Sequence, residues 1–479
     1  MVQAIAPIVA VLIGSGFMLA GYGLQSTLLP LRGELEGFSE LSLGLLGSAY
    51  YIGFVAGCLF GPFVILRSGH IRAFAAMVAI GSAAALAFPL LVAPTSWSLF
   101  RLLFGFCIAC LFNIVESWLN DKATNTTRGQ VMSAYVLVSF GTIMLGQLAV
   151  TLYPITDFAQ FALSSILLSL AAVPIALTNS GQPAPIAVVR FRPHHLFRST
   201  PAAFVGATGS GLILGAIWGF GPVFVTSLGY SANTAAVFMS LCFVGGAIGQ
   251  YPLGRLSDFY DRRIVMVAAM VASTIFALLL ARAEAESWWL LAALGFGFGA
   301  MAFPGYSLAA AHAFDSTASE DMVETSATVL LLYGAGSIIG PLIAAVVMKS
   351  AGPGGLFLYC AVVQLLLAAF ILVRIRKRAA LTTEEKSDFD IYSTAPVGGA
   401  ITPEAVDESH PQMEMPEPPE TVESEFDHLV ETAGFPLPDA ETDYDDLLQA
   451  PAGEEPLDAL SDEVNRGGGN MPDSESRSS

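Results

Sequence analysis

Charged side chains are scarce in this sequence. Asp, Glu, Lys and Arg make up 13% of its 479 residues, whereas soluble domains carry about 25%. Apolar residues make up 54%, and the mean hydropathy is +0.64. Because charges are costly in hydrocarbon and apolar side chains are not, this composition excludes an ordinary soluble domain. We predict a membrane protein that crosses the bilayer many times.

Patterns typical of several enzyme and cofactor classes are also missing. The sequence has no phosphate-binding glycine loop, and its apolar runs hold no pair of His residues at metal-ligand spacing. All five cysteines fall within apolar runs, which indicates no disulfide framework, and Cys107 and Cys110 are interpreted as packing residues. We therefore expect no cofactor, no metal, no nucleic-acid partner and no enzymatic activity.

Acidic residues are concentrated at one end of the chain. Residues 1–378 hold 18 Lys and Arg and 14 Asp and Glu, whereas residues 379–479 hold 3 and 26. The second stretch is rich in Pro and Ser and has no long apolar run, a composition typical of disorder. We predict a disordered acidic cytoplasmic tail over residues 379–479. Its two short apolar segments, 426–430 and 444–448, are either solvated coil or a docking motif for a basic cytosolic partner.

Twelve apolar runs are long enough to cross a bilayer as helices, at about 20 residues per span. The predicted helices cover residues 4–30, 42–66, 73–93, 98–119, 130–153, 161–178, 202–228, 232–254, 264–281, 288–311, 326–349 and 356–373. The first run lacks the basic start of a signal peptide, so it is expected to remain as a span. A Pro-rich, basic stretch, residues 179–200, separates the first six helices from the last six and is interpreted as a cytoplasmic linker. The sequence thus predicts an all-α membrane protein with six-helix bundles over residues 1–178 and 201–378.

The distribution of basic residues predicts how the chain is oriented. If both termini are cytoplasmic, the cytoplasmic segments hold fourteen Lys and Arg residues and the outer segments hold three. Lys and Arg favour cytoplasmic loops. We therefore predict cytoplasmic N- and C-termini.

The two predicted bundles repeat one another at a nearly constant offset. The equivalent pairs are Gly53 and Gly246, Gly61 and Gly254, Gly146 and Gly340, and Pro30 and Pro222, with offsets of 192 to 194 residues. Pro30 is expected to end the first helix. Such a repeat indicates a duplicated six-helix unit with pseudo-symmetric halves.

One stretch, residues 242–263, combines a close-packing helix with a cluster of charges. Its apolar part holds small residues, Gly245, Gly246 and Gly249, that let another helix approach closely. It then changes into a charged segment that contains Gly254, Arg255, Asp258, Asp261, Arg262 and Arg263. We interpret this segment as a hinge in which the acids pair with Arg and hold one of two arrangements. The alternative is that the arginines only fix the topology.

The charged segment resembles the signature loop of the major facilitator superfamily, which lies between the second and third helices of a half. The same place in the first half holds Gly61, Arg67, Gly69 and Arg72, with an apolar residue where the family has an acid. Two other motifs are similar to family patterns, namely Arg101-xxx-Gly105 and, in the eleventh helix, Gly336-xxx-Gly340-Pro341. The resemblance covers roughly residues 1–375 and is strongest to a bacterial subgroup of unassigned substrate.

The resemblance implies a secondary active transporter of a small molecule, working by alternating access in the bacterial inner (plasma) membrane. Protons carried by Glu116 would drive it, or it would be a uniporter. The alternative is a non-transporting sensor or scaffold whose acidic tail recruits a cytosolic partner. A membrane enzyme would need several His, Asp or Glu residues near one face, and the spans offer one Glu.

Arg101 and Glu116 are the ionisable residues most clearly inside the predicted spans. Being 15 residues apart, they lie about 22 Å apart along a helix axis and cannot pair. Glu116 either carries a proton or pairs with a nearby arginine. Asp121 and Arg128 lie just beyond it and complete this candidate charge network. Arg101 either attracts an anionic substrate or holds a helix end.

The family resemblance also implies a central cavity lined by helices 1, 4, 7 and 10. The candidate cavity residues on these helices are Gln25, Asn113, Trp218 and Tyr306. Each of them is alternatively an interhelical hydrogen-bonding residue or an interfacial aromatic residue. We expect a weakly charged, aromatic cavity that suits a neutral or amphipathic small molecule.

Overall fold

The structure, a computed structural model, describes residues 8–123, 127–178, 183, 191–284, 287–318 and 321–377. Its described residues form helices and connecting turns, and twelve spans among them are long and apolar enough to cross a membrane. The predicted all-α fold with twelve spans is therefore confirmed. All described residues belong to one unit, residues 1–407. The predicted tail over residues 379–479, with its candidate docking segments, lies outside the described residues.

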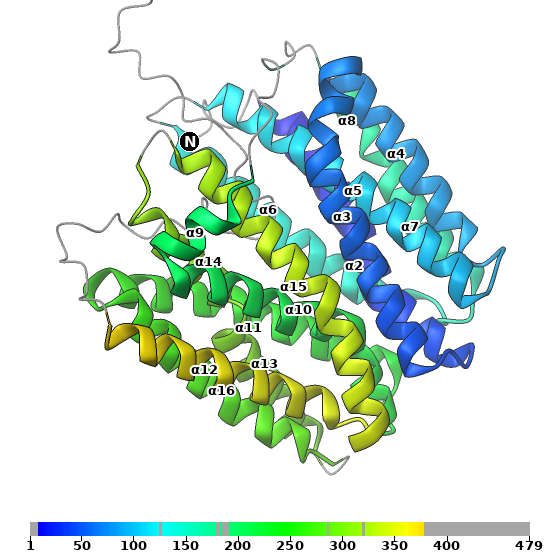
Figure 1. The fold of residues 1–479 in the computed structure, drawn as a ribbon. Coiled ribbons are helices and arrows are strands. Elements are labelled where there is room, and N and C mark those ends of the chain that lie inside the picture. The colour runs from blue at the N-terminus through cyan, green and yellow to red at the C-terminus, as the bar shows by residue number, and fades with distance from the viewer. Residues whose placement is uncertain are drawn as a thin grey trace, which may run out of the picture. The chain divides into compact units, whose positions relative to one another are not determined.

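The helices follow one another in two sets separated by the linker region (Figure 1). The first set comprises α2 (Val9–Leu35), α3 (Glu40–Ser68), α4 (His70–Ala87), α5 (Pro94–Lys122), α6 (Arg128–Ala149) with the 3-10 turn η2 (Val150–Leu152), α7 (Phe158–Leu170) and α8 (Ala172–Ala176). The second set comprises α10 (Pro201–Ser227), α11 (Ala232–Phe259), α12 (Arg262–Ala281), α13 (Trp288–Ala302), α14 (Gly305–Phe314), α15 (Met322–Ala351) and α16 (Gly355–Ile375). A short helix that the sequence did not predict, α9 (Pro193–Ser199), lies between them.

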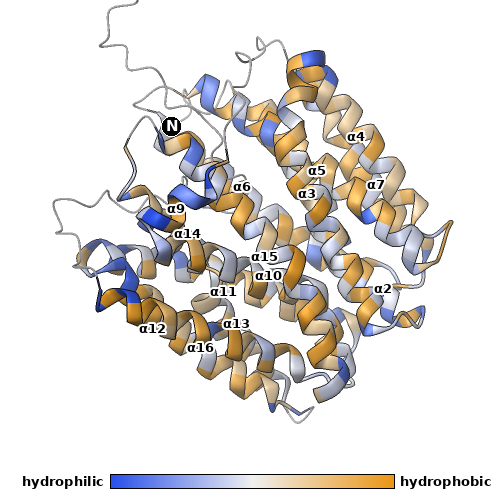
Figure 2. Ribbon diagram, in the orientation of Figure 1, coloured by the Kyte–Doolittle hydropathy of each residue, from blue (hydrophilic) through white to orange (hydrophobic). Residues whose placement is uncertain are grey.

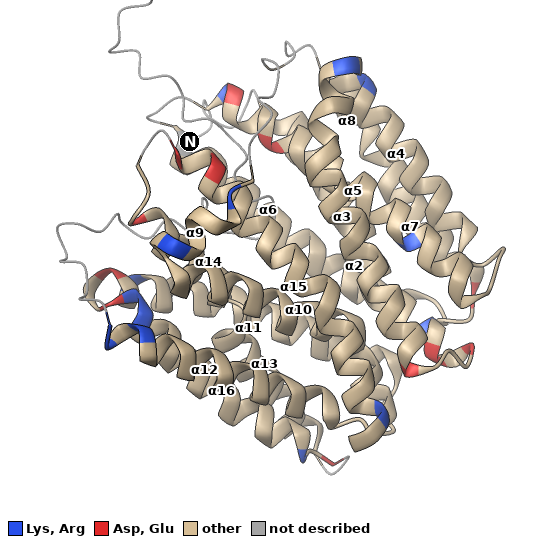
Figure 3. Ribbon diagram, in the orientation of Figure 1, with Lys and Arg blue, Asp and Glu red and all other residues tan. Residues whose placement is uncertain are grey.

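Each set makes six spans, because α7 with α8 and α13 with α14 form one span each. Hydrophobic residues fill the middle of the helices, and polar residues gather at their ends (Figure 2). Lys, Arg, Asp and Glu are likewise concentrated near helix ends (Figure 3). This distribution is the one that a hydrocarbon layer requires of spanning helices.

The prediction that Pro30 ends the first helix is wrong. Helix α2 runs from Val9 to Leu35, and both Pro30 and its counterpart Pro222 lie inside helices. A proline removes one backbone hydrogen bond, but neighbouring helices can support a long spanning helix through such a position. The predicted end of the first helix, at Pro30, is therefore five residues before its observed end at Leu35.

The helix ends define two faces. We call the face at which α8 ends and α10 begins, on either side of the linker region, the linker face. Helices α3, α5 and α11 also end at this face, at Ser68, Lys122 and Phe259. The opposite ends, including those of α2 and α10 at Leu35 and Ser227, form the short-loop face. Within each half, consecutive spans are joined by connections of one to seven residues, which requires antiparallel neighbours. Along the chain, successive connections between spans therefore lie alternately at the short-loop face and at the linker face.

Equivalent helix pairs pack in the same way in the two halves. A Cβ atom added at Gly146 of α6 would lie 2.1 Å from the Ala20 carbonyl oxygen of α2. A Cβ added at Gly340 of α15 would lie 2.1 Å from the Leu212 carbonyl oxygen of α10. Only glycine permits such an approach of two backbones. The two close contacts are therefore made by glycines that are 194 residues apart, which supports the duplicated unit inferred from the sequence.

The halves meet mainly through four helix pairs, α3 with α15, α6 with α11, α2 with α10, and α3 with α10. The Ser48 hydroxyl donates to the Ile338 carbonyl oxygen over 2.6 Å. The Ser240 hydroxyl donates to Oε1 of Gln147 over 3.3 Å. These bonds lie closer to the short-loop ends of their helices than to the linker ends. These two hydrogen bonds therefore join the halves on the short-loop side.

Candidate functional site

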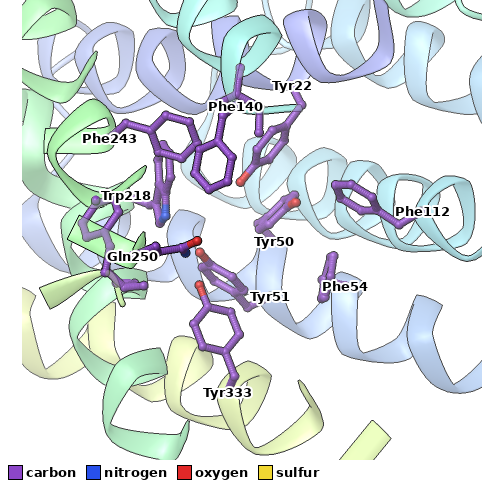
Figure 4. A pocket seen from close by; sticks show the side chains of 14 residues that line it. Tyr22, Tyr50, Tyr51, Phe54, Phe112, Phe140, Trp218, Phe243, Gln250 and Tyr333 are labelled. Atoms are coloured by element: carbon purple, nitrogen blue, oxygen red, sulfur yellow. The ribbon is translucent and has the colours of Figure 1, made fainter. Parts of the chain in front are cut away.

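A cavity lies between the two halves and is walled mainly by aromatic rings (Figure 4). It contains about 740 Å³ of space not occupied by protein atoms, open solvent included. Eight spans contribute to its wall. The lining residues are Tyr22, Tyr50, Tyr51, Phe54, Phe112, Phe140, Ile143, Leu214, Trp218, Phe243, Gly246, Gln250, Phe303 and Tyr333.

One continuous set of rings covers the first-half side of the cavity and reaches into the second half. Tyr22 of α2 stacks on Tyr50 of α3, with ring centroids 5.7 Å apart. Tyr50 contacts Tyr51 edge-on at 5.1 Å, and Tyr51 contacts Tyr333 of α15 at 6.4 Å. Edge and offset contacts of this kind are favourable beyond the area they bury. Tyr51 and Tyr333 therefore join the halves through their rings at the cavity.

A second set of rings forms the opposite wall. Phe140 of α6 lies 4.9 Å from Phe243 of α11, and Phe243 lies 5.8 Å from Trp218 of α10. Figure 4 shows the Trp218 indole nitrogen and the hydroxyls of Tyr51 and Tyr333 directed toward the interior of the cavity. The cavity thus offers large π-faces and few hydrogen-bonding groups.

Arg101 is the charged residue closest to this aromatic wall. Its guanidinium carbon lies 4.7 Å from the centroid of the Tyr50 ring. The side chain is 6% exposed, and its Nη1 atom has no hydrogen-bond partner among the described residues. Arg101 lines a second, smaller cavity that shares Tyr22, Tyr50, Tyr51 and Trp218 with the first. A buried positive charge therefore adjoins the aromatic cavity.

Glu116 lies farther along the same helix, toward the linker face. It is 4% exposed, and no described residue forms a hydrogen bond with its Oε1 atom. The groups that interact with its charge include Tyr135 of α6 and Tyr306 of α14, which belongs to the second half. Among the described side chains, no cation lies within 4.0 Å of its carboxylate. Glu116 is therefore a buried acid at a site that both halves approach.

The other members of the candidate charge network are arranged differently. Asp121 pairs with its neighbour Lys122 over 2.9 Å at the surface. Arg128 begins α6, but its side chain is outside the described part of the structure. Arg67 and Arg72, the arginines of the first-half motif, are exposed. The described residues thus do not bring these groups to Glu116.

The four candidate cavity residues occupy different places. Trp218 lies in the cavity wall. Tyr306 does not line the cavity but contacts the lining residue Tyr333, with ring centroids 5.1 Å apart. Gln25 is fully buried with both amide atoms unpartnered, and the Asn113 amide nitrogen is buried next to Gly61. The substrate role of these residues stays a prediction.

The second-half signature segment forms a buried ion pair that its sequence alone did not reveal. Arg262, at the start of α12, donates from Nε to Oδ2 of Asp315 over 2.7 Å and from Nη2 to Oδ1 over 3.2 Å. Both side chains are 1% exposed. Arg262 also donates to Ser257 and lies 3.5 Å from Asp258 at the end of α11. The guanidinium therefore links the ends of α11 and α14 to the start of α12.

The remaining charges of this segment make a local contact. Arg263 donates to the Asp261 carboxylate from Nε and Nη2. The same carboxylate caps α12 by accepting from the backbone N–H of Arg263. Burial alone would raise the pKa of Asp261, but the hydrogen bonds and charge of Arg263 outweigh it and hold that pKa below its usual value. Arg255 is exposed, and Gly254 is buried.

The first-half segment has a different junction. A single residue, Gly69, separates α3 from α4, and its φ of +79° is a conformation that favours glycine. The next residue, His70, is buried, and its Nε2 lies 3.1 Å from the Ser117 hydroxyl of α5. Gly61 is buried against α5. A neutral contact of His70 thus occupies the place that the Arg262–Asp315 ion pair has in the second half.

Two groups of residues were missed from the sequence. Asp315 is 194 residues after Asp121, the same offset as the Gly146 and Gly340 pair, so the repeat contained a signal for it. The adjacent Tyr50 and Tyr51 occur in the second helix, which is not among the four helices that the resemblance places at the cavity. Their bulk and polarity in a glycine-rich helix were the available signal.

A hydrogen-bonded contact also joins the halves at the short-loop face. The Thr226 hydroxyl of α10 donates to Oε2 of Glu34 in α2 over 2.6 Å, and the Ser227 hydroxyl lies 3.4 Å from Oε1. Glu34 is not paired with a described cation within 4.0 Å. We call this contact the Glu34 latch.

We expect Glu34→Gln to weaken closure of the short-loop face. Loss of the carboxylate charge converts charge-assisted bonds into neutral ones, a difference of about 1 kcal/mol, or roughly fivefold in the ratio of closed to open forms. The ratio is measured from distances between spin labels at Glu40→Cys and Asn233→Cys, exposed positions at this face of the two halves. Glu36→Gln is the control, because Glu36 pairs with Arg32 of its own helix. Equal distance distributions for both variants would contradict the latch.

Comparisons with known proteins agree with this architecture. A family model described as Major Facilitator Superfamily matches residues 202–406. An uncharacterized MFS-type transporter of Enterobacter sp. (strain 638) is 26% identical over 376 residues, which cover 78% of this chain and 96% of that protein. The uncharacterized MFS-type transporter YcaD of Escherichia fergusonii is 25% identical over 371 residues, 76% of this chain and 95% of that protein.

Two solved structures have a similar fold. The nucleoside transporter NupG has a TM-score of 0.64 at 16% identity, covering 77% of this chain and 99% of that chain. A bacterial homologue of the human lysosomal transporter Spinster, in an inward-facing and occupied conformation, has a TM-score of 0.62 at 14% identity, covering 79% and 97%. The twelve apolar spans and the paired halves show a multi-pass membrane protein, and the family match over its second half together with these relatives shows that it is similar to transporters of the major facilitator superfamily.

Proposed function

We propose that this transporter moves a small molecule by alternating access, as a carrier and not as an enzyme. The observation that supports this most directly is the position of the aromatic cavity between two similar halves, with several hydrogen bonds joining the halves on its short-loop side. In alternating access, two repeats rock about a central site, which opens to one side at a time. The structure would then represent the form closed at the short-loop face.

The linker face is proposed to be cytoplasmic, in a bacterial inner membrane. The uneven distribution of Lys and Arg between the loops supports this orientation. The form closed at the short-loop face would accordingly be the inward-facing one. The alternative role as a sensor or scaffold depends on residues 379–479, which lie outside the described residues.

Paired distance measurements test alternating access without knowledge of the substrate. Spin labels at Glu40→Cys and Asn233→Cys report on the short-loop face, and labels at Gln130→Cys and Tyr260→Cys report on the linker face. These four positions are exposed, and the five native cysteines are buried. Alternating access predicts two populations in which one pair is close when the other is far. A single population at both faces under all conditions would rule this mechanism out.

Proton coupling is proposed to proceed through Glu116. A carboxylate buried without a cation is costly in a low-dielectric environment, and binding a proton removes its charge. Tyr306 of the second half interacts with Glu116 of the first, so protonation changes an interaction between the two moving parts. This arrangement would let proton binding shift the equilibrium between the two forms.

We expect Glu116→Gln to remove the pH dependence of that equilibrium. Gln resembles the protonated acid and cannot ionise, so, with Glu34 also replaced by Gln to remove the titratable latch carboxylate, both label distances should stay constant when the pH changes from about 5 to about 9. The wild-type distances should change over that range. Glu284→Gln, at an exposed position, is the matched control in the same Glu34→Gln background and should respond to pH as the wild type does. A pH response that survives in Glu116→Gln with Glu34 also replaced would exclude Glu116 as the proton carrier.

A further inference from the structure

Proton coupling and alternating access leave one buried charge without a role. Arg101 is 6% exposed, and within the part of the chain that the structure describes its Nη1 has no hydrogen-bond partner. Among the described side chains, no Asp or Glu oxygen lies within 4.0 Å of it. Burying an unpaired ion is costly, and a cation–π contact such as the one with Tyr50 offsets only part of that cost. The contacts of Arg101 therefore do not compensate for its burial.

The surroundings of Arg101 place it at the boundary between the halves. The small cavity that it lines is closed on the other side by Gly215, Trp218 and Gly219 of α10. At the two glycines the α10 backbone itself forms the wall, because their Cβ positions point toward Ser337 and Pro341 of α15. An anionic group in this space would contact Arg101 of the first half and α10 of the second half together.

The same space continues into the aromatic cavity. Tyr22, Tyr50, Tyr51 and Trp218 line both cavities. A ligand with its anionic end at Arg101 would therefore extend its other end between these rings. Flat π-systems stack favourably on such walls. The few polar groups there, such as the Gln250 amide and the Tyr51 hydroxyl, suit a ligand with little further polarity.

We propose that the ligand of this cavity is a small aromatic carboxylate, with its carboxylate at Arg101 and its single ring between Tyr50, Tyr51 and Trp218. This assignment rests on the proposed transport function, whose substrate it specifies. It also revises the neutral or amphipathic ligand that the composition of the helices suggested. A neutral ligand would leave Arg101 unpaired, and a cationic one would be repelled by it.

Four probe compounds separate the contribution of charge from that of the ring. Benzoate has both features, benzamide lacks the charge, cyclohexanecarboxylate lacks the aromatic ring, and cyclohexanecarboxamide lacks both. Binding to the detergent-purified full chain is measured by calorimetry. A charge-assisted hydrogen bond is worth about 1.5–3 kcal/mol, so benzoate should bind at least about tenfold more tightly than benzamide. Benzoate should also bind more tightly than cyclohexanecarboxylate.

Substitution of Arg101 tests where the carboxylate lies. Arg101→Gln should reduce the preference for benzoate over benzamide to about onefold. Arg101→Lys keeps the charge but not the forked geometry, so it should retain a reduced preference. Lys349→Gln removes an exposed positive charge and should leave the preference unchanged. Both Arg101 variants are compared with the wild type in thermal unfolding, and Arg101→Lys keeps the test valid if Arg101→Gln does not fold.

The outcomes distinguish this inference from the proposed function. Equal affinity for benzoate and benzamide, no binding of either, or tighter binding of benzylamine would overturn the aromatic-carboxylate assignment. Alternation of the two label pairs would show in each of these cases that the transport mechanism still holds. Conversely, selective benzoate binding through Arg101 without alternation would leave the site intact and refute the transport mechanism.

Discussion

Replacing Arg262 by Leu is expected to destabilise the protein by about 3–5 kcal/mol, because it leaves Asp315 buried without its bidentate partner. The Asp315 side chain is 1% exposed, so water cannot easily replace the guanidinium. The same substitution also removes the contacts of Arg262 with Ser257 and Asp258. Unfolding by denaturant or heat in detergent, followed by intrinsic fluorescence, measures the loss.

Two further variants give this prediction its controls. Arg255→Leu changes an exposed arginine of the same segment and should alter stability by less than about 0.5 kcal/mol. Replacing both Arg262 and Asp315 by Leu should recover most of the loss, because it removes the pair without leaving a buried charge. If Arg262→Leu proved as stable as Arg255→Leu, the ion pair would not be holding the helix ends together.

The corresponding substitutions in the first half should matter less. Arg67 and Arg72 are exposed, and the buried contact at this junction is the neutral one between His70 and Ser117. A single hydrogen bond of this kind contributes about 0.5–1.5 kcal/mol. The two linker-face junctions are therefore unequal, and the second half is the more firmly fixed of the two.

Gly146→Ala is expected to have the second large effect. The added Cβ would lie 2.1 Å from the Ala20 carbonyl oxygen, a backbone atom that can move only if α2 and α6 separate. Overpacking of this kind costs about 1–3 kcal/mol, and separation of two long helices favours the upper end of that range. The apparent melting temperature in detergent should fall by several degrees.

The same helix offers a matched control. A Cβ added at Gly141 would meet no atom within 4 Å, so Gly141→Ala should leave stability unchanged or raise it by up to about 1 kcal/mol through helix propensity. Gly340→Ala should repeat the loss seen for Gly146→Ala, since its Cβ would lie 2.1 Å from the Leu212 carbonyl oxygen. Equal stability of the Gly141 and Gly146 variants would refute the close contact of α2 and α6.

The sequence predicted those features that depend on solvation and local pattern. Hydrocarbon excludes charge, so the twelve spans could be recognised from runs of apolar residues alone. The repeat was visible because Gly146 and Gly340 serve the same helix contact in each half. Helix ends were less certain, as Pro30 shows, because packing from neighbouring helices can carry a helix past a proline.

The candidate site was only partly predictable. Trp218 was found because it is a large aromatic residue on a helix that the family resemblance places at the cavity. Tyr50 and Tyr51 line the cavity together with Tyr333, which is 283 residues after Tyr50 in the sequence. The residue pattern of a single helix does not predict such a contact. The pairing of Arg262 with Asp315 was missed for the same reason, since nearer acids stood in the same motif.

The sequence by itself determined that this chain lies in a membrane as two repeated six-helix halves. That follows from transfer free energies and from glycine spacing, which act along each helix separately. Only the tertiary structure decided which side chains meet between the halves, including the aromatic cavity, the Glu34 latch and the unpaired Arg101. Those contacts depend on how helices from distant parts of the chain are rotated and shifted against one another, and hydropathy, which records only preference for lipid or water, carries little information about either.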